Sequence, residues 1–117
     1  MELLRHGTGD ETIAELRGEG VLVSNTGDAL DLIGNAGARS IVLRAGQLHP
    51  DFFKLRTGLA GDILQKFTNY RVRLAIIGDF GKLQSPALRD FIRESNDDGQ
   101  ISFVASLEDA LAALRGK

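Results

Sequence analysis

The apolar run Leu-Ala-Ile-Ile at residues 74–77 constrains the fold of this chain most strongly. It lacks the alternation of polar and apolar residues that a half-exposed strand shows, and such runs are typical of strands covered on both faces of a parallel sheet. We therefore expect Leu74, Ala75, Ile76 and Ile77 to be buried in a central strand. Residues 40–45 and 101–105 contain similar apolar runs and predict two more strands.

Segments with helical periodicity lie between these runs. Residues 24–38 predict a helix that Asn25 or Thr26 caps and that Gly34 or Gly37 ends. The residues expected on its inner face are Ala29, Leu30, Ile33 and Ala36.

Three further helices are predicted. Apolar residues four apart, with Thr57 as the expected N-cap and Asn69 at the end, indicate a helix with the inner residues Leu59, Ile63 and Phe67. Ser85 and Pro86 suit the cap and first position of the next helix, whose expected inner residues are Leu88, Phe91 and Ile92. Residues 106–117 predict the last helix, which opens on a capping box of Ser106 and Asp109.

The N-terminal region has a different pattern. Residues 2–6 and 11–17 alternate in part and flank a turn-rich stretch, which predicts a β-hairpin. The β-branched run at residues 20–24 could add a strand. Strands that then alternate with helices imply parallel pairing through right-handed crossovers. We expect residues 1–117 to form one α/β domain, with a small, mostly parallel sheet, an antiparallel N-terminal hairpin and about four helices.

Composition excludes several functional classes. The 117 residues contain no cysteine, which excludes disulfides and thiolate metal sites, and the two histidines lack a suitable partner in the sequence, so no metal or cofactor is expected. The net charge of −2 argues against nucleic-acid binding. Early charges argue against a secretory signal, and the longest apolar run is too short to span a bilayer. We expect a cytoplasmic protein that does not bind membranes.

Most of the chain resembles a bacterial family catalogued as domain of unknown function 4180. The resemblance rests on residues 52–80, 85–96 and 101–114, and the segment Asp-Ala-Leu-Asp-Leu-Ile-Gly at residues 28–34 also fits it. This family label implies no particular activity.

The order of elements is also similar, more distantly, to the STAS domain of sulfate transporters and anti-sigma-factor antagonists. Residues 57–59, Thr-Gly-Leu, resemble the Ser-Gly-Leu part of the STAS turn, where a serine is phosphorylated in many members. The resemblance implies a regulatory role and phosphorylation of Thr57. Two departures are visible: Leu55-Arg56 replaces the usual aspartate, and Ala60 is an additional residue before Gly61.

The candidate site lies at the carboxyl ends of the predicted strands, where ligands of parallel sheets gather. Two interpretations of Gly61 remain open, because it could face the sheet or keep an outer surface flat for a partner. Asp79 could bond its own turn or act as an acid or base. The candidate residues for a partner or ligand surface are Asp28, Thr57, Gly58, Gly61, Asp79 and Lys82.

These features predict a non-enzymatic regulatory or protein-interaction module whose partner is another protein or a second copy of the chain. The alternative is a protein that binds a small ligand or anion, or a minor enzyme, at the same edge. An enclosed pocket around a carboxylate with a raised pKa would favour the alternative. A shallow exposed surface would favour the interaction module.

Overall fold

A mixed sheet forms the centre of the protein. The computed structural model describes residues 1–83 and 85–115, and in this part of the chain five strands lie in the sequential order β1-β2-β3-β4-β5. β1 is antiparallel to β2, and the other neighbours are parallel, so the predicted α/β class and N-terminal hairpin are confirmed. The strands are β1 Glu2–His6, β2 Ile13–Arg17, β3 Ser40–Arg44, β4 Arg73–Ile77 and β5 Ile101–Val104.

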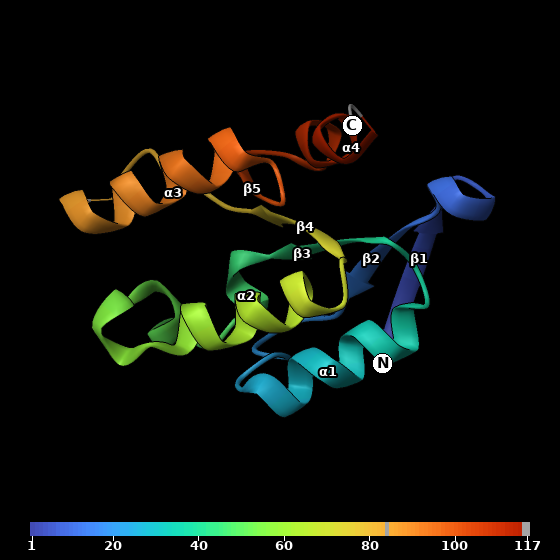
Figure 1. The fold of residues 1–117 in the computed structure, drawn as a ribbon, viewed down its shortest axis with the longest axis horizontal. Coiled ribbons are helices and arrows are strands. Elements are labelled where there is room, and N and C mark those ends of the chain that lie inside the picture. The colour runs from blue at the N-terminus through green and yellow to red at the C-terminus, as the bar shows by residue number, and fades with distance from the viewer. Residues whose placement is uncertain (84, 116–117) are drawn as a thin grey trace.

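Helices cover the sheet unequally. The first three pack on one face, where they share a large apolar core with the strands, and the fourth packs on a smaller apolar cluster on the other face. This is the layering that successive right-handed crossovers in one direction produce. The helices are α1 Thr26–Ala36, α2 Leu59–Asn69, α3 Pro86–Asp98 and α4 Leu107–Arg115 (Figure 1).

The central strand behaves as its sequence predicts. Leu74, Ala75 and Ile76 of β4 have no exposed surface, and Ile77 is half-buried. Leu74 and Ile76 belong to the core under α1–α3, whereas Ala75 packs with Ala110 of α4. The continuous apolar run is thus required because each face of β4 meets a different helical layer.

The segment at residues 20–24 is not a strand. Only Val23 forms a β-bridge, with Leu48. The backbone N–H groups of Leu22 and Val23 both donate to the carbonyl of Gln47, at 2.8 and 2.9 Å. The segment is therefore bound to the turn after β3. A turn cannot supply the continuous row of hydrogen bonds that a strand needs.

The caps of α1 agree with the sequence, but one of its inner residues does not. Asn25 accepts a hydrogen bond from the backbone N–H of Asp28, and Gly37 ends the helix with a φ of 55°. The expected inner residue Leu30 is 37% exposed, and Leu32 is fully buried in its place. The inner stripe runs through positions three and four apart from Ala29, which places residue 32 inside and residue 30 outside.

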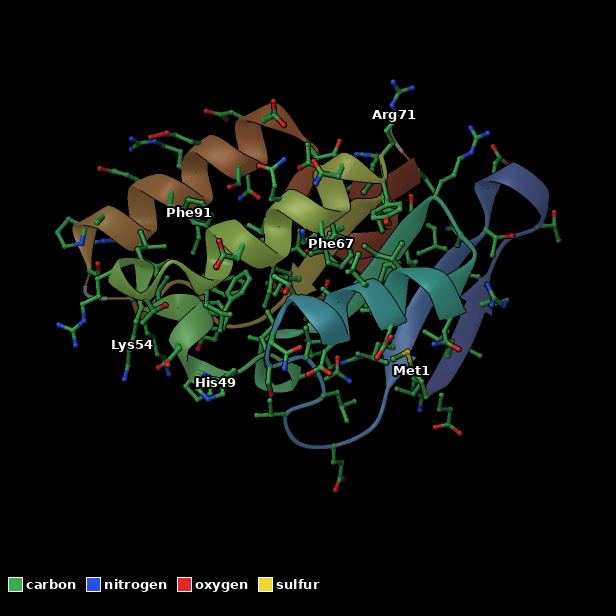
Figure 2. The ribbon with its side chains drawn as sticks, turned by 60° about the horizontal axis from the view of Figure 1, so that its bottom comes forward. Met1, His49, Lys54, Phe67, Arg71 and Phe91 are labelled. Carbon is green, nitrogen blue, oxygen red and sulfur yellow. The ribbon has the colours of Figure 1, made fainter. Side chains whose placement is uncertain are left out.

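The end of α2 agrees with the sequence. Asn69 is the last helical residue, Tyr70 is the C-cap, and Arg71 adopts the left-handed conformation with a φ of 56°. The N–H of Arg71 donates to Thr68, and the N–H of residue 72 donates to Phe67, as in a Schellman stop. Figure 2 shows Phe67 within the molecule and Arg71 pointing outward.

The last two helices begin as expected. The side chain of Ser85 accepts from the N–H of Leu88 at 3.2 Å, and that of Ser106 accepts from the N–H of Asp109 at 3.1 Å. On α3, Leu88 and Ile92 are buried, whereas Phe91 is half-buried at the rim.

Candidate functional site

The start of α2 is an exposed turn with a fixed backbone. Gly58, not Thr57, is the N-cap, and its φ of 78° is a conformation that glycine adopts without strain. The hydroxyl of Thr57 lies 2.8 Å from the carbonyl oxygens of Asp51 and Lys54, to which it donates, and it accepts from the N–H of Leu59 at 3.2 Å. Thr57 therefore ties the turn together from the solvent side.

Gly61 faces solvent. It is exposed, and a Cβ atom added to it would meet no other atom within 4 Å. The interpretation that Gly61 allows close packing inside the fold is wrong. Gly58 and Gly61 thus leave two exposed positions without a side chain at the start of α2, beside the exposed Asp62.

Asp79 lies in an open loop directly after β4. Its side chain is 69% exposed, and its carboxylate is 3.7 Å from the ammonium group of Lys82. Gly78 is crowded, because an added Cβ would lie 2.7 Å from the ring of Phe80 and 3.0 Å from Ala45. The loop is therefore packed tightly at Gly78, where it leaves β4, whereas its charged residues Asp79 and Lys82 lie in water.

An aromatic contact joins this loop to the turn before α2. The ring of Phe53 lies 6.2 Å from that of Phe80, and Phe80 packs edge-to-face on Phe103 of β5 at 5.3 Å. Because Phe53 belongs to the turn that the Thr57 hydroxyl closes, the two segments flank one side of the molecule. We call Thr57, Gly58, Gly61, Asp79 and Lys82 the docking surface.

Asp28 has a local structural role. Its carboxylate accepts from the N–H of Ser24 at 2.9 Å, and its own N–H donates to the side chain of Asn25 at 2.8 Å. The first bond ties the residue before the N-cap to Asp28, and the second is the N-cap bond of Asn25, so Asp28 helps to close the start of α1. The structure thus assigns Asp28 to α1 and does not join it to the docking surface.

A buried charged cluster escaped the sequence analysis. The Glu15 side chain of β2 is 3% exposed and accepts from Nε2 of His6 and Nη1 of Arg44, each at 2.8 Å. Burial raises the pKa of Glu15, but the hydrogen bonds and charges of its two partners outweigh burial and lower that pKa below its ordinary value. A carboxylate of lowered pKa is poorly suited to act as an acid near neutral pH.

One signal for this cluster is present in the sequence. Glu15 interrupts an otherwise apolar stretch between Ala14 and Leu16. A charge inside a buried strand needs a partner. Its partners are 9 and 29 residues away in the sequence, so finding them requires the register of three strands.

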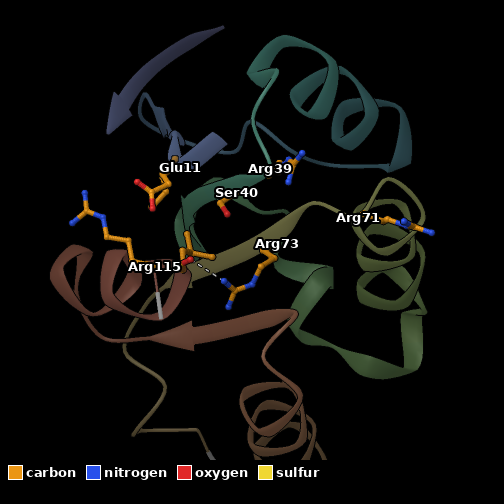
Figure 3. A pocket seen from close by; sticks show the side chains of 8 residues that line it. Glu11, Arg39, Ser40, Arg71, Arg73 and Arg115 are labelled. Atoms are coloured by element: carbon orange, nitrogen blue, oxygen red, sulfur yellow. Dashed lines mark hydrogen bonds between the residues drawn. The ribbon is translucent and has the colours of Figure 1, made fainter. Parts of the chain in front are cut away.

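A cavity of about 290 Å³ lies at the opposite edge of the sheet, where the strands begin. Four arginines line it, yet Figure 3 shows Arg71 and Arg115 pointing to opposite sides. Arg73 donates to the carbonyls of Leu114, Ala113 and Gly99 at 2.8–3.0 Å. These carbonyls include the negative end of α4, so Arg73 complements a helix end, and the guanidinium groups do not converge on a ligand.

The described residues form neither a metal site nor a membrane-spanning helix. Within residues 1–83 and 85–115, no three His, Asp or Glu side chains gather in a way that could hold a metal ion. The helices in that part of the chain are all too short or too polar to cross a membrane.

A family model matches almost the entire chain. It is described as Domain of unknown function (DUF4180), and the match covers residues 8–114. No curated protein and no solved structure matches at a significant level. The matched range includes α2, the Asp79 loop and Glu15, so both the docking surface and the buried cluster lie within it. The chain belongs to the DUF4180 family of domains of unknown function.

Proposed function

We propose that this protein is a non-enzymatic regulatory module that binds another protein through the docking surface. The observation that carries the proposal is the exposed Gly61 in the first turn of α2, with open space where a side chain would stand. A glycine in a helix lowers stability by about 0.5–1 kcal/mol relative to alanine. Because no packing inside the fold requires Gly61, a partner that lies close against the helix gives a reason for it.

Rigidity of the turn supports the same function. The Thr57 hydroxyl bonds and the packing of Phe53 on Phe80 hold the turn in one conformation. A preorganised surface loses little conformational entropy when a partner binds.

Phosphorylation of Thr57 is proposed as the regulatory step. The hydroxyl is exposed, and the chain resembles STAS domains at this turn. A phosphate would add about −1.5 to −2 charges beside the positive end of α2, which the fold can accept. The esterified oxygen could no longer donate to Asp51 and Lys54, so the turn would open and the partner would be released.

The alternative, a ligand site or enzyme built on Asp79, has weaker support. That carboxylate is mostly exposed and paired with Lys82. The hollow beside it, about 500 Å³, is bounded mainly by the loop and the end of β5. Neither feature desolvates Asp79 as acid–base chemistry near neutral pH would require.

The test compares proteins captured by matched variants in the native cells. Gly61→Leu places bulk on the docking surface, and Gly34→Leu is its control, because Gly34 is also exposed in a helix with no atom within 4 Å of an added Cβ. Gly34 lies near the end of α1, at the other edge of the sheet.

We expect a protein that is captured by the wild type and by Gly34→Leu and is lost from Gly61→Leu and Thr57→Glu. Both leucine variants should melt within a few degrees of the wild type, because neither leucine enters the core. Identical captured proteins from all four chains would refute the docking surface.

A further inference from the structure

β1 forms an open edge of the sheet. It pairs with β2 on one side and is the terminal strand of the sheet that the described residues form. Figure 1 shows β1 at the end of the sheet opposite β5. Its outer backbone N–H and C=O groups are therefore available for another strand.

The edge of β1 carries charged side chains but no residue that would prevent backbone pairing. Residues 2–6 contain no proline, glycine or lysine. Its two basic side chains bond within their own chain: Arg5 donates to the carbonyl of Ala36 at 2.6 Å, and His6 donates to Glu15 at 2.8 Å. These side chains are held on the faces of the sheet and leave the edge itself accessible.

An exposed leucine marks the same strand. Leu4 is 44% exposed and lies on the face that carries α4. That helix packs mainly on β3, β4 and β5, so it leaves Leu4 uncovered. The preceding Met1 is also exposed. β1 thus combines unpaired backbone with apolar surface.

We propose that β1 binds the β1 strand of a second copy in antiparallel orientation and so continues the sheet across a two-fold axis. A two-fold axis perpendicular to the sheet requires one residue to face its own counterpart. The register centred on Leu4 pairs all five residues of the strand. It sets Leu4 opposite Leu4, Glu2 opposite His6 and Leu3 opposite Arg5.

The side chains favour this register over the one centred on Arg5. Glu2 lies opposite His6, whose Nε2 is bound to Glu15 of its own copy, so no like charges of the two β1 strands face each other. The two copies of Leu4 cover each other on the uncovered face. A register centred on Arg5 would place two guanidinium groups opposite each other, which is unfavourable.

Such a dimer leaves the docking surface accessible. The docking surface follows β3 and β4, whereas the two-fold axis passes through β1 at the end of the sheet. Each dimer would carry two docking surfaces, which raises the apparent affinity for a partner that has two binding segments.

The test is the solution mass of the full chain, measured by light scattering during size-exclusion chromatography. We expect the wild type to have twice the 12.6 kDa mass of one chain. Leu4→Lys should give 12.6 kDa, because two ammonium groups would meet at the axis. Within one copy, the new ammonium lies opposite Glu15, which favours folding. Tyr70→Lys, at an exposed apolar residue distant from β1, should remain dimeric.

A second variant tests the register independently of Leu4→Lys. The chain contains no cysteine, so Leu4→Cys introduces a single thiol that the proposed register places opposite its copy. Mild oxidation should link most of this variant into covalent dimers, whereas Tyr70→Cys should stay monomeric. A wild type that remains monomeric up to about 1 mM, a dimer that Leu4→Lys does not dissociate, or equal cross-linking of both cysteine variants would overturn the proposal.

Discussion

Replacing Glu15 with glutamine tests the buried cluster that joins β1, β2 and β3. The carboxylate accepts one hydrogen bond from His6 and one from Arg44, each at 2.8 Å. Glutamine has nearly the same volume, but one of its two terminal atoms is a donor. Its oxygen can accept from Arg44, and its amide group can donate to Nε2 of His6 when the imidazole proton is on the other ring nitrogen. Both bonds then lose the charge of the carboxylate and become weaker.

The expected loss of stability in Glu15→Gln follows from these two hydrogen bonds. A hydrogen bond to a charged group contributes about 1.5–3 kcal/mol, so the pair gives an upper range of about 3–6 kcal/mol. The side chain of Arg44 is 43% exposed, so hydrogen bonds to water can replace part of its lost interaction with the carboxylate. We therefore expect Glu15→Gln to lower the free energy of unfolding by about 2 kcal/mol at pH 7, or the melting temperature by about 8 °C.

The pH dependence of the free energy of unfolding tests separately whether Glu15 stabilises the fold in its charged form. The pKa of Glu15 is lowered in the folded state from 4.5, so its stabilising effect is present above pH 4.5 and is lost as the pH falls through the folded pKa. The difference between wild type and Glu15→Gln should shrink in acid. Denaturant unfolding at several pH values measures it, with the exposed Glu19→Gln as control. A difference below about 0.5 kcal/mol at pH 7, or one that stays constant in acid, would refute the reasoning.

Three further predictions concern the backbone. Gly61→Ala should raise the free energy of unfolding by about 0.5–1 kcal/mol, whereas Gly58→Ala should lower it by about 1–2 kcal/mol because of its positive φ; urea unfolding separates the two. Arg71→Gly should stabilise by about 1 kcal/mol in the same assay, since the left-handed position at the end of α2 favours glycine. Amide exchange of residues 74–76 should be among the slowest in the chain, and rates like those of the termini would contradict their central position.

The parts of the fold that local rules determine could be predicted from the sequence. The strand at residues 74–77 needs only an apolar run, and the caps at Asn25 and Ser85 need only a side-chain acceptor near an open helix end. In each case the physical cause lies within a few residues of its effect, so the sequence contains the whole signal.

The predictions that the structure corrects concern features that depend on a distant contact or on a backbone angle. Residues 20–24 have strand propensity, but Gln47 binds their backbone in a turn. The N-cap was assigned to Thr57 because threonine is a good cap, although the left-handed angle of Gly58 determines where α2 begins. The exposure of Gly61 depends on which helical face meets the sheet, and the sequence near a helix start leaves that choice open.

The docking surface is the central claim, and native mass spectrometry of the protein purified from its own cells tests it most directly. We predict a bound protein on the wild type and on Gly34→Leu, with the complex absent from Gly61→Leu, although that variant is at least as stable as the wild type. The dimer adds a multiple of 12.6 kDa and is therefore distinguishable from a partner of another mass. A bound small molecule in place of a protein, or a complex that Gly61→Leu retains, would contradict the claim.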